Sequence, residues 1–158
     1  MIICISGTPG TGKSVIAKKL GKKLRYGILE ISKFVKNNKI GKYNKKLKTI
    51  DVDVDKLNDK LIKIIKKNKN LIIDGHLSHY LPRKYVDLCI IVRCNLKVLE
   101  KRLDKRGYNK QKIKDNLEAE IFDTSLDEAY RNKHNIIVIE NSGKFDVKPV
   151  LRLIQKRL

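Results

Sequence analysis

The residues best suited to phosphate chemistry lie in the segment Gly7–Ser14, whose sequence GTPGTGKS matches GxxxxGK[ST] at every fixed position. Glycines allow successive backbone N–H groups to turn inward around phosphate oxygens. An apolar run precedes the segment and an amphipathic run follows it, as expected for a strand, a loop and a helix whose positive end faces the same anion. The segment therefore predicts binding of a nucleoside triphosphate.

Individual residues of this loop have distinct expected roles. Lys13 is expected to reach the β- and γ-phosphates, and the Ser14 hydroxyl is expected to bind Mg²⁺. The rest of the predicted nucleotide cradle consists of small residues: Gly7, Gly10, Thr11 and Gly12.

A second candidate site follows the apolar run Leu71–Ile73, which has the character of a buried parallel strand. In phosphate-loop folds, an acid at such a carboxyl end meets the metal, commonly through water, so Asp74 is the second predicted Mg²⁺ residue. An ordinary N-cap or turn aspartate is the alternative. His76 could orient a water or tune the acid, because its reference pKa is near neutrality, but it also fits an ordinary loop histidine. His79 and His134 have no comparable support and are expected at the surface.

Arg102 and Arg106 lie four residues apart and therefore share one face of a predicted helix. Two guanidinium groups that face the transferring phosphoryl oxygens would stabilise their charge. A hinge at Gly107–Asn109 would let this segment close over the site and exclude water. The alternative is a solvated face on which the arginines pair with Glu100 and Asp104.

The elements that must position these residues follow from the hydrophobic pattern. Short apolar runs alternate with longer amphipathic stretches, which predicts an α/β fold: a three-layer phosphate-loop NTPase domain with a parallel five-stranded sheet covered on both faces. The predicted strands are Met1–Ile5, Ile28–Ile31, Leu71–Asp74, Asp87–Val92 and Asn135–Ile139. The predicted helices are Ser14–Arg25, Ser32–Lys39, one capped by Asp53 or Asp55, one from Asn95 to Gly107, Lys110–Tyr130 and Val147–Leu158. The basic segment Gly41–Thr49 is expected to be a mobile loop.

Composition narrows the class of protein. The 158 residues suit one domain, and a hydrophobic content of 41% supports one core and excludes wholesale disorder. Lys and Arg total 37 against 17 Asp and Glu, a net charge of +20 that should attract polyanions. A lysine-rich proteome of an AT-rich or heat-loving source would explain this charge equally well.

The apolar runs are far shorter than the ~20 residues that cross a bilayer, and Met1–Ile5 lacks the features of a signal peptide. We therefore expect a cytoplasmic protein without a membrane association. The cysteines Cys4, Cys89 and Cys94 lack metal-ligand spacing and are expected to be small buried hydrophobes in a reducing compartment.

With these residues placed, the chain resembles the adenylate kinase isoenzyme 6 family, also called coilin-interacting nuclear ATPase, over roughly Met1 to Tyr130. The matching motifs are Asp74-Gly75-His76 with Pro82 after it, Val98–Asn109, Lys112–Asn116 and Ala119–Phe122. The resemblance implies one kinase domain over 1–158, of the nucleoside monophosphate kinase type. A monophosphate-binding segment is expected at about 30–53 and a short lid at about 105–115.

The resemblance also implies roles for single residues. It adds Val15 to the nucleotide cradle, makes Asp74 the metal-side acid and His76 the motif histidine, and makes Arg106 the lid arginine that contacts nucleotide. Lys13, His76, Arg102 and Arg106 become the expected catalytic set. Lys36 stands where the family has an arginine that grips the AMP phosphate, and a lysine there gives a point charge without the bidentate fork.

The function implied by the resemblance is Mg²⁺-dependent transfer of the ATP γ-phosphoryl group to AMP or another nucleoside monophosphate, with ATPase activity. The family is linked to maturation of the small ribosomal subunit, which implies the eleventh small-subunit protein and the pre-ribosomal particle as partners, with rRNA contact as a possibility. The alternatives are an ATP-driven assembly switch with little kinase activity, or another small-molecule phosphate-loop kinase.

Overall fold

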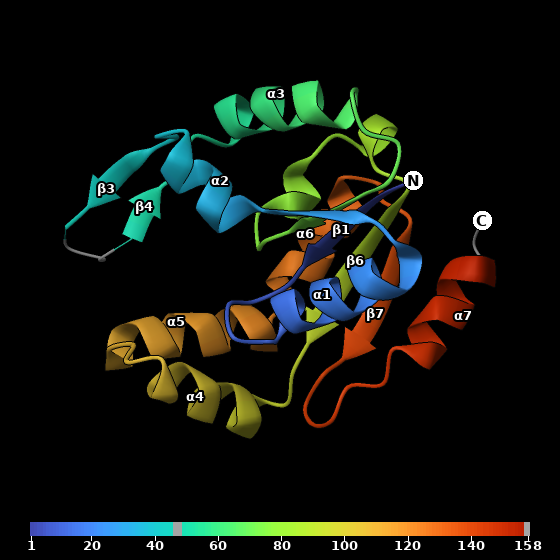
Figure 1. Ribbon diagram of the computed structural model, residues 1–158. Coiled ribbons are helices and arrows are strands. Elements are labelled where there is room, and N and C mark those ends of the chain that lie inside the picture. The colour runs from blue at the N-terminus through green and yellow to red at the C-terminus, as the bar shows by residue number, and fades with distance from the viewer. Residues whose placement is uncertain (46–48, 157–158) are drawn as a thin grey trace.

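Five parallel strands form the central sheet of the computed structural model, which describes residues 1–45 and 49–156 (Figure 1). The strands run in the order β2-β5-β1-β6-β7 across the sheet. The strands of this sheet are β1 (Ile2–Ser6), β2 (Gly27–Glu30), β5 (Leu71–Asp74), β6 (Leu88–Arg93) and β7 (Ile136–Glu140). The predicted parallel sheet is confirmed, and its central strand is the one that leads into the glycine-rich loop.

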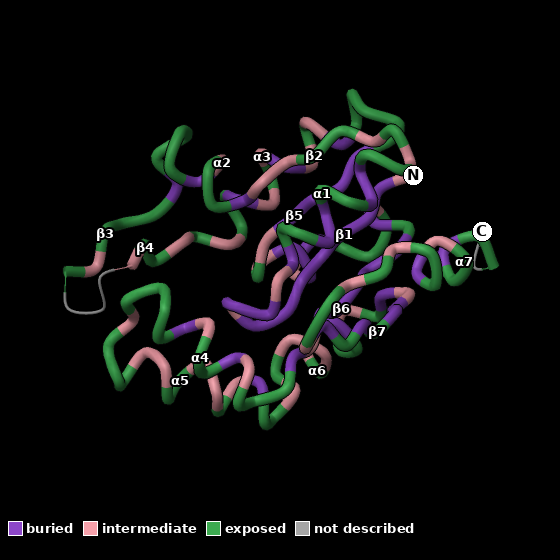
Figure 2. Tube along the Cα trace, turned by 60° about the horizontal axis from the view of Figure 1, so that its bottom comes forward, coloured by how far each residue is buried: buried purple, intermediate pink, exposed green. Residues whose placement is uncertain are grey.

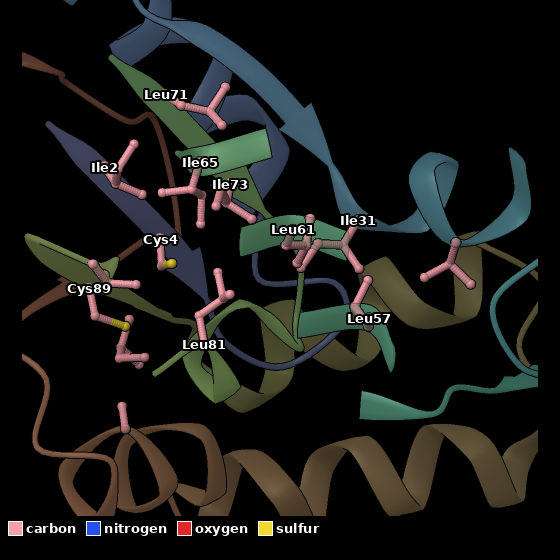
Figure 3. Packing of buried hydrophobic residues seen from close by; sticks show 14 of the residues in the cluster. Ile2, Cys4, Ile31, Leu57, Leu61, Ile65, Leu71, Ile73, Leu81 and Cys89 are labelled. Carbon is pink, nitrogen blue, oxygen red and sulfur yellow. The ribbon is translucent and has the colours of Figure 1, made fainter. Parts of the chain in front are cut away.

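Helices cover both faces of this sheet, because successive side chains of a strand point to opposite faces. On β1, Ile3 and Ile5 pack with α1 and α7, whereas Ile2 and Cys4 pack with α2, α3 and α6. Figure 3 shows the second of these clusters between strands and helices. The covering helices are α1 (Lys13–Leu24), α2 (Ile31–Asn37), α3 (Val54–Ile65), α6 (Thr124–Arg131) and α7 (Lys148–Lys156).

Two further helices, α4 (Leu96–Lys105) and α5 (Lys110–Ile121), lie side by side beyond the sheet, as both views show (Figures 1 and 2). They share a small apolar cluster of their own, formed around Leu99 and Leu103. The burial colours of Figure 2 show mostly exposed residues along this pair. The pair is therefore attached to the domain by few buried side chains.

Two predicted elements differ from the structure. The expected loop Gly41–Thr49 includes an antiparallel pair, β3 (Lys42–Asn44) and β4 (Thr49–Asp51), while residues 46–48 of that segment lie outside the described residues. The expected single helix Lys110–Tyr130 is instead the two helices α5 and α6. The break comes at Asp123, whose φ of 51° is left-handed and ends a right-handed helix.

The three cysteines are buried and free of disulfide bonds, in agreement with their expected role as small hydrophobes. Within residues 1–45 and 49–156, no helix combines the length and the apolar character that crossing a bilayer requires.

A buried polar network connects β1 to α6, and its centre is His79. The side chains of His79 and His134 are 1% and 8% exposed, so the prediction that both lie at the surface was wrong. His79 Nδ1 lies 2.6 Å from Ser6 Oγ, and its Nε2 lies 2.9 Å from a carboxylate oxygen of Glu128. His134 Nε2 lies 2.8 Å from the His79 carbonyl oxygen. These partners satisfy both ring nitrogens of His79 and Nε2 of His134. They come from distant parts of the chain that a local pattern does not connect.

The same network makes folding stability depend on pH. Burial lowers the pKa values of His79 and His134 below the ordinary value of 6.5. The unfolded chain then binds protons that the folded chain does not, so stability is lost as pH falls through 6.5, by up to about 1.4 kcal/mol per pH unit for each histidine. Denaturant unfolding at pH 7.5 and 5.5 measures this loss. His79→Gln, which cannot titrate, should show a smaller loss between the two pH values, and an unchanged loss would contradict the assignment.

Candidate active site

The loop between β1 and α1 is shaped by glycines that no other residue can replace. Gly7, Gly10 and Gly12 have φ values of 135°, 97° and 96°. A Cβ at Gly7 would lie 2.2 Å from the Val92 carbonyl oxygen, and a Cβ at Gly12 would lie 2.2 Å from Asn141 Nδ2. Both the backbone conformation and the close approach of neighbouring strands therefore require glycine.

Lys13 is the first residue of α1, and its ammonium group folds back onto the loop. Nζ donates hydrogen bonds of 2.9 Å to the carbonyl oxygens of Gly7 and Thr8. Burial lowers the pKa of Lys13 to about 8, although the nearby carboxylate of Asp74 opposes this shift. The result is a poorly solvated cation at the start of a helix, where an anion would be strongly stabilised.

Asp74 lies beside the loop because β5 pairs with β1 in a register that aligns Asp74 with Ile5. Its side chain is buried, and Oδ1 has no hydrogen-bond partner among the described residues. Burial raises the pKa of Asp74, and the adjacent Ser14 hydroxyl and Lys13 ammonium lower it. The carboxylate and the Ser14 hydroxyl thus adjoin each other at the loop, as the sequence predicts.

The Asp74 carboxylate and the Ser14 hydroxyl suit a Mg²⁺ ion that is bound together with a nucleotide. They are too few to hold a metal ion by protein ligands alone. No group of three or more His, Cys, Asp or Glu side chains that could hold a metal ion occurs in the described part of the chain. Mg²⁺ in nucleotide enzymes is usually bound through one or two protein ligands together with phosphate oxygens and water. An unpartnered buried carboxylate oxygen next to a hydroxyl is compatible with that donor set.

A cavity of about 480 Å³ opens in front of the loop. One wall is formed by the loop and the end of β5, and another is formed by apolar residues of α2 and the β4 region. The third wall comes from the end of α4 and from α5. Residues that line these walls include Ser14, Asp74, Ile31, Val52, Arg106 and Lys112.

A second cavity, of about 520 Å³, adjoins the first at the loop. It shares Gly10, Gly12, Val15 and Arg106 with the first cavity. Its remaining walls include the segment that follows β7, with Asn141, Lys144 and Phe145. The glycine-rich loop therefore borders both cavities, and Arg106 lines both of them.

His76 lies in the first cavity with an exposed side chain. The surrounding cleft walls, and then the positive charge of Lys13, lower the pKa of His76 to about 4. The imidazole is therefore neutral near pH 7 and can accept a hydrogen bond. The structure thus brings together Lys13, Ser14, Asp74, His76 and Arg106 of the predicted set.

Arg102 is hydrogen-bonded to backbone carbonyl groups at the base of the loop. Its Nη1 donates to the Asn141 carbonyl oxygen at 2.9 Å, and it lies 3.4 Å from the Thr11 carbonyl oxygen and 3.3 Å from Cys94 Sγ. The guanidinium group therefore contacts the carbonyl oxygens of Thr11 and Asn141, and Arg102 also lines a cavity that it shares with Arg106. These contacts arise because α4 packs against the loop, where Leu99 would be 2.8 Å from a Cβ at Gly10.

Lys36 is not brought to the site. Its side chain is exposed on α2, one turn after Ser32, and Ser32 lines the first cavity whereas Lys36 does not. Val35, the residue before Lys36, does line this cavity, so the absence of Lys36 from the lining reflects the direction in which its side chain leaves α2.

Sequence reasoning missed several residues of the site. Asn141 Nδ2 donates a 2.8 Å hydrogen bond to the Thr11 carbonyl oxygen and so holds the loop. Its position directly after β7 is a usable signal, because the carboxyl ends of parallel strands gather at one edge. Tyr108, Lys112 and Asn116 line the first cavity, but nothing in their local pattern distinguishes them from other lid residues.

Comparison with known proteins agrees with this geometry. A family model described as "AAA domain" matches residues 3–123. A Thermococcus kodakarensis protein named "Putative adenylate kinase" is 38% identical over 159 residues, covering 99% of this chain and 86% of the relative. A Caenorhabditis elegans protein named "Adenylate kinase isoenzyme 6 homolog" is 34% identical, covering 87% of this chain and 77% of the relative.

Among solved structures, deoxyadenosine kinase from M. mycoides with bound dATP superposes with a TM-score of 0.61 at 22% identity. The match covers 99% of this chain and 98% of that one, and it shows a shared fold. From its loop, its sheet and its sequence relatives, the chain belongs to the adenylate-kinase-like family of phosphate-loop proteins.

Proposed function

We propose that this chain is a nucleoside monophosphate kinase that transfers the γ-phosphoryl group of ATP to AMP. The observation that carries the proposal is a pair of adjoining cavities that share residues of one phosphate-binding loop. Phosphoryl transfer between two nucleotides needs two binding spaces that meet at the transferred group, together with cations around it. The named relatives support a nucleotide kinase independently of this geometry.

The donor side of the proposed site is built on the loop and the second cavity. The loop N–H groups and Lys13 would hold the triphosphate, and the segment with Asn141 and Phe145 would border the base. Ser14 and Asp74 are the residues that would hold Mg²⁺, which would neutralise developing charge on the phosphates when bound. Arg106 faces both cavities and would contact the nucleotide at their junction.

The acceptor side is the part of the first cavity bordered by α2 and β4. Its apolar walls, which include Ile31, Val35 and Val52, suit the flat face of a base. The α4–α5 pair, which contains the predicted lid 105–115, forms the opposite wall. Its closure over the site would exclude water, which competes with the acceptor for the phosphoryl group.

We also propose ATP hydrolysis as a second activity of the same site, because His76 is a neutral imidazole exposed in the first cavity. A neutral imidazole can orient an attacking water by accepting a hydrogen bond from it. Water would reach the phosphoryl group whenever the acceptor space is unfilled.

A role in maturation of the small ribosomal subunit, with its eleventh protein and rRNA nearby, is a further part of the proposal. It is supported by the distribution of the net charge of +20. Helices α1 and α7 cover one face of the sheet and contain Lys and Arg but no Asp or Glu. None of the ion pairs among the described residues involves these two helices. A face of uncompensated cations attracts polyanions.

An acceptor screen tests the kinase directly. Purified protein with ATP and Mg²⁺ should phosphorylate AMP faster than other nucleoside monophosphates and faster than it hydrolyses ATP without an acceptor. Lys13→Ala should lower kcat/KM by about two to three orders of magnitude, because it removes a charge that stabilises the transferred group. Lys23→Ala, an exposed lysine of the same helix, is the matched control. Transfer to no nucleoside monophosphate would refute the kinase.

Proton uptake tests the state of Lys13. Because the pKa of Lys13 is about 8 before binding, a triphosphate that requires the ammonium form must bind together with a proton at higher pH. Calorimetric titration of MgATP in two buffers of different ionisation enthalpy should show uptake of most of one proton at pH 8.5 and a small fraction at pH 7. Equal uptake at both pH values would show that another group is titrating.

Substitution of His76 separates the two proposed activities. His76→Ala removes the side chain that would orient the attacking water, so ATP hydrolysis without an acceptor should fall by about ten- to a hundredfold and transfer to AMP should fall less. Coupled assays of ADP formation with and without AMP measure both rates. Equal losses would mean that His76 has no special part in hydrolysis.

A further inference from the structure

We propose that Lys112 of α5 binds the phosphate group of the acceptor nucleotide, so that this contact comes from the lid and not from α2. The inference rests on the proposed function, because it identifies the acceptor-side cation of that same site. It differs from the expectation for Lys36, which lies outside the cavity.

The position of Lys112 is on the acceptor side of the site. Lys112 lines the first cavity and, unlike Arg106, is absent from the walls of the second cavity. The cations that line the first cavity, within the described part of the chain, are Lys13, Arg106 and Lys112. Lys13 belongs to the phosphate-binding loop and Arg106 is shared with the donor side, which leaves Lys112 for the acceptor.

The Lys112 ammonium group lacks a compensating anion. None of the ion pairs among the described residues includes it, and its side chain is half-buried. Nζ lies 4.3 Å from the centre of the Tyr108 ring, whose face attracts a cation but does not neutralise it. A partly desolvated cation without a carboxylate partner is stabilised strongly by a phosphate.

Neighbouring lysines of α5 point elsewhere, which makes the placement of Lys112 specific. Lys112 and Asn116 lie four residues apart and both line the cavity, so they mark one helical face. Lys114 lies 3.8 Å from Glu118, and Lys110 lines a separate groove on the outer side of the α4–α5 pair.

The backbone at Lys112 is also fixed in the first turn of α5. The Asn109 side chain caps the helix by accepting a 2.8 Å hydrogen bond from the Lys112 N–H, and Asn116 Nδ2 donates to the Lys112 carbonyl oxygen at 2.6 Å. The lysine therefore projects from a rigid helical turn. A phosphate bound there would tie the lid to the acceptor, so that the lid closes fully only when the acceptor is present.

The test compares four variants in steady-state phosphotransfer with ATP and AMP: Lys112→Met, Lys112→Arg, Lys36→Met and the matched control Lys110→Met. Lys112→Met should raise the KM for AMP by about ten- to a hundredfold, the usual effect of losing one charge-assisted hydrogen bond, and should change the KM for ATP much less. Lys112→Arg should restore most of the affinity. Lys110→Met should behave as the unsubstituted protein, and Lys36→Met should have a smaller effect than Lys112→Met.

Binding of AMP and adenosine, measured by calorimetry, adds a readout that a merely structural role would not change. Lys112→Met should weaken binding of AMP and leave binding of adenosine, which lacks the phosphate, within about twofold. Equal weakening of both ligands, an equal rise in the KM for ATP, or a larger effect of Lys36→Met would overturn the inference and leave the kinase intact. Failure of the unsubstituted protein to phosphorylate any monophosphate would instead overturn the proposed function and this inference with it.

Discussion

The close packing of one loop between strand ends is the constraint on which the site depends. Gly7 approaches the backbone of β6, and Gly12 approaches Asn141 after β7, so closely that neither position has room for a Cβ. The Thr11 carbonyl oxygen accepts a hydrogen bond from Asn141 Nδ2, with the Arg102 guanidinium nearby. These contacts hold the loop in place before any ligand binds, which lowers the entropic cost of binding an anion.

The electrostatics of the site follow from that packing. Lys13 and Asp74 are both buried beside the loop, and burial disfavours the charged form of each. Each group partly compensates the other, but the Asp74 carboxylate keeps one oxygen without a partner and Lys13 is satisfied only by carbonyl oxygens. Burying these two charges costs free energy in the absence of ligand. Binding of a phosphate and a divalent cation would offset that cost.

The α4–α5 pair is built differently from the rest of the molecule. The apolar side chains between α4 and α5 form a small separate cluster. The two faces of the sheet are covered by much larger apolar clusters. Arg102 connects this pair to the Asn141 carbonyl oxygen next to the loop, and the buried Glu120 accepts a hydrogen bond from the Cys94 N–H at the end of β6. One end of the α4–α5 pair is thus hydrogen-bonded to the neighbourhood of the loop, while Arg106 and Lys112 line the cavities.

The sequence by itself determined the elements whose causes are local. The spacing of glycines, Lys13 and Ser14, the apolar strands and the acid at the end of β5 were all readable, because backbone freedom and hydrophobic periodicity act over a few residues. Only the tertiary structure decided which carbonyl groups Arg102 contacts, that His79 is buried against Ser6 and Glu128, and that Lys112 lines the cavity where Lys36 does not. Those outcomes depend on how helices distant in the chain pack against the sheet. The local sequence around a charged or polar residue is the same whether its side chain faces solvent, a loop or a cleft, so the sequence alone does not distinguish these cases.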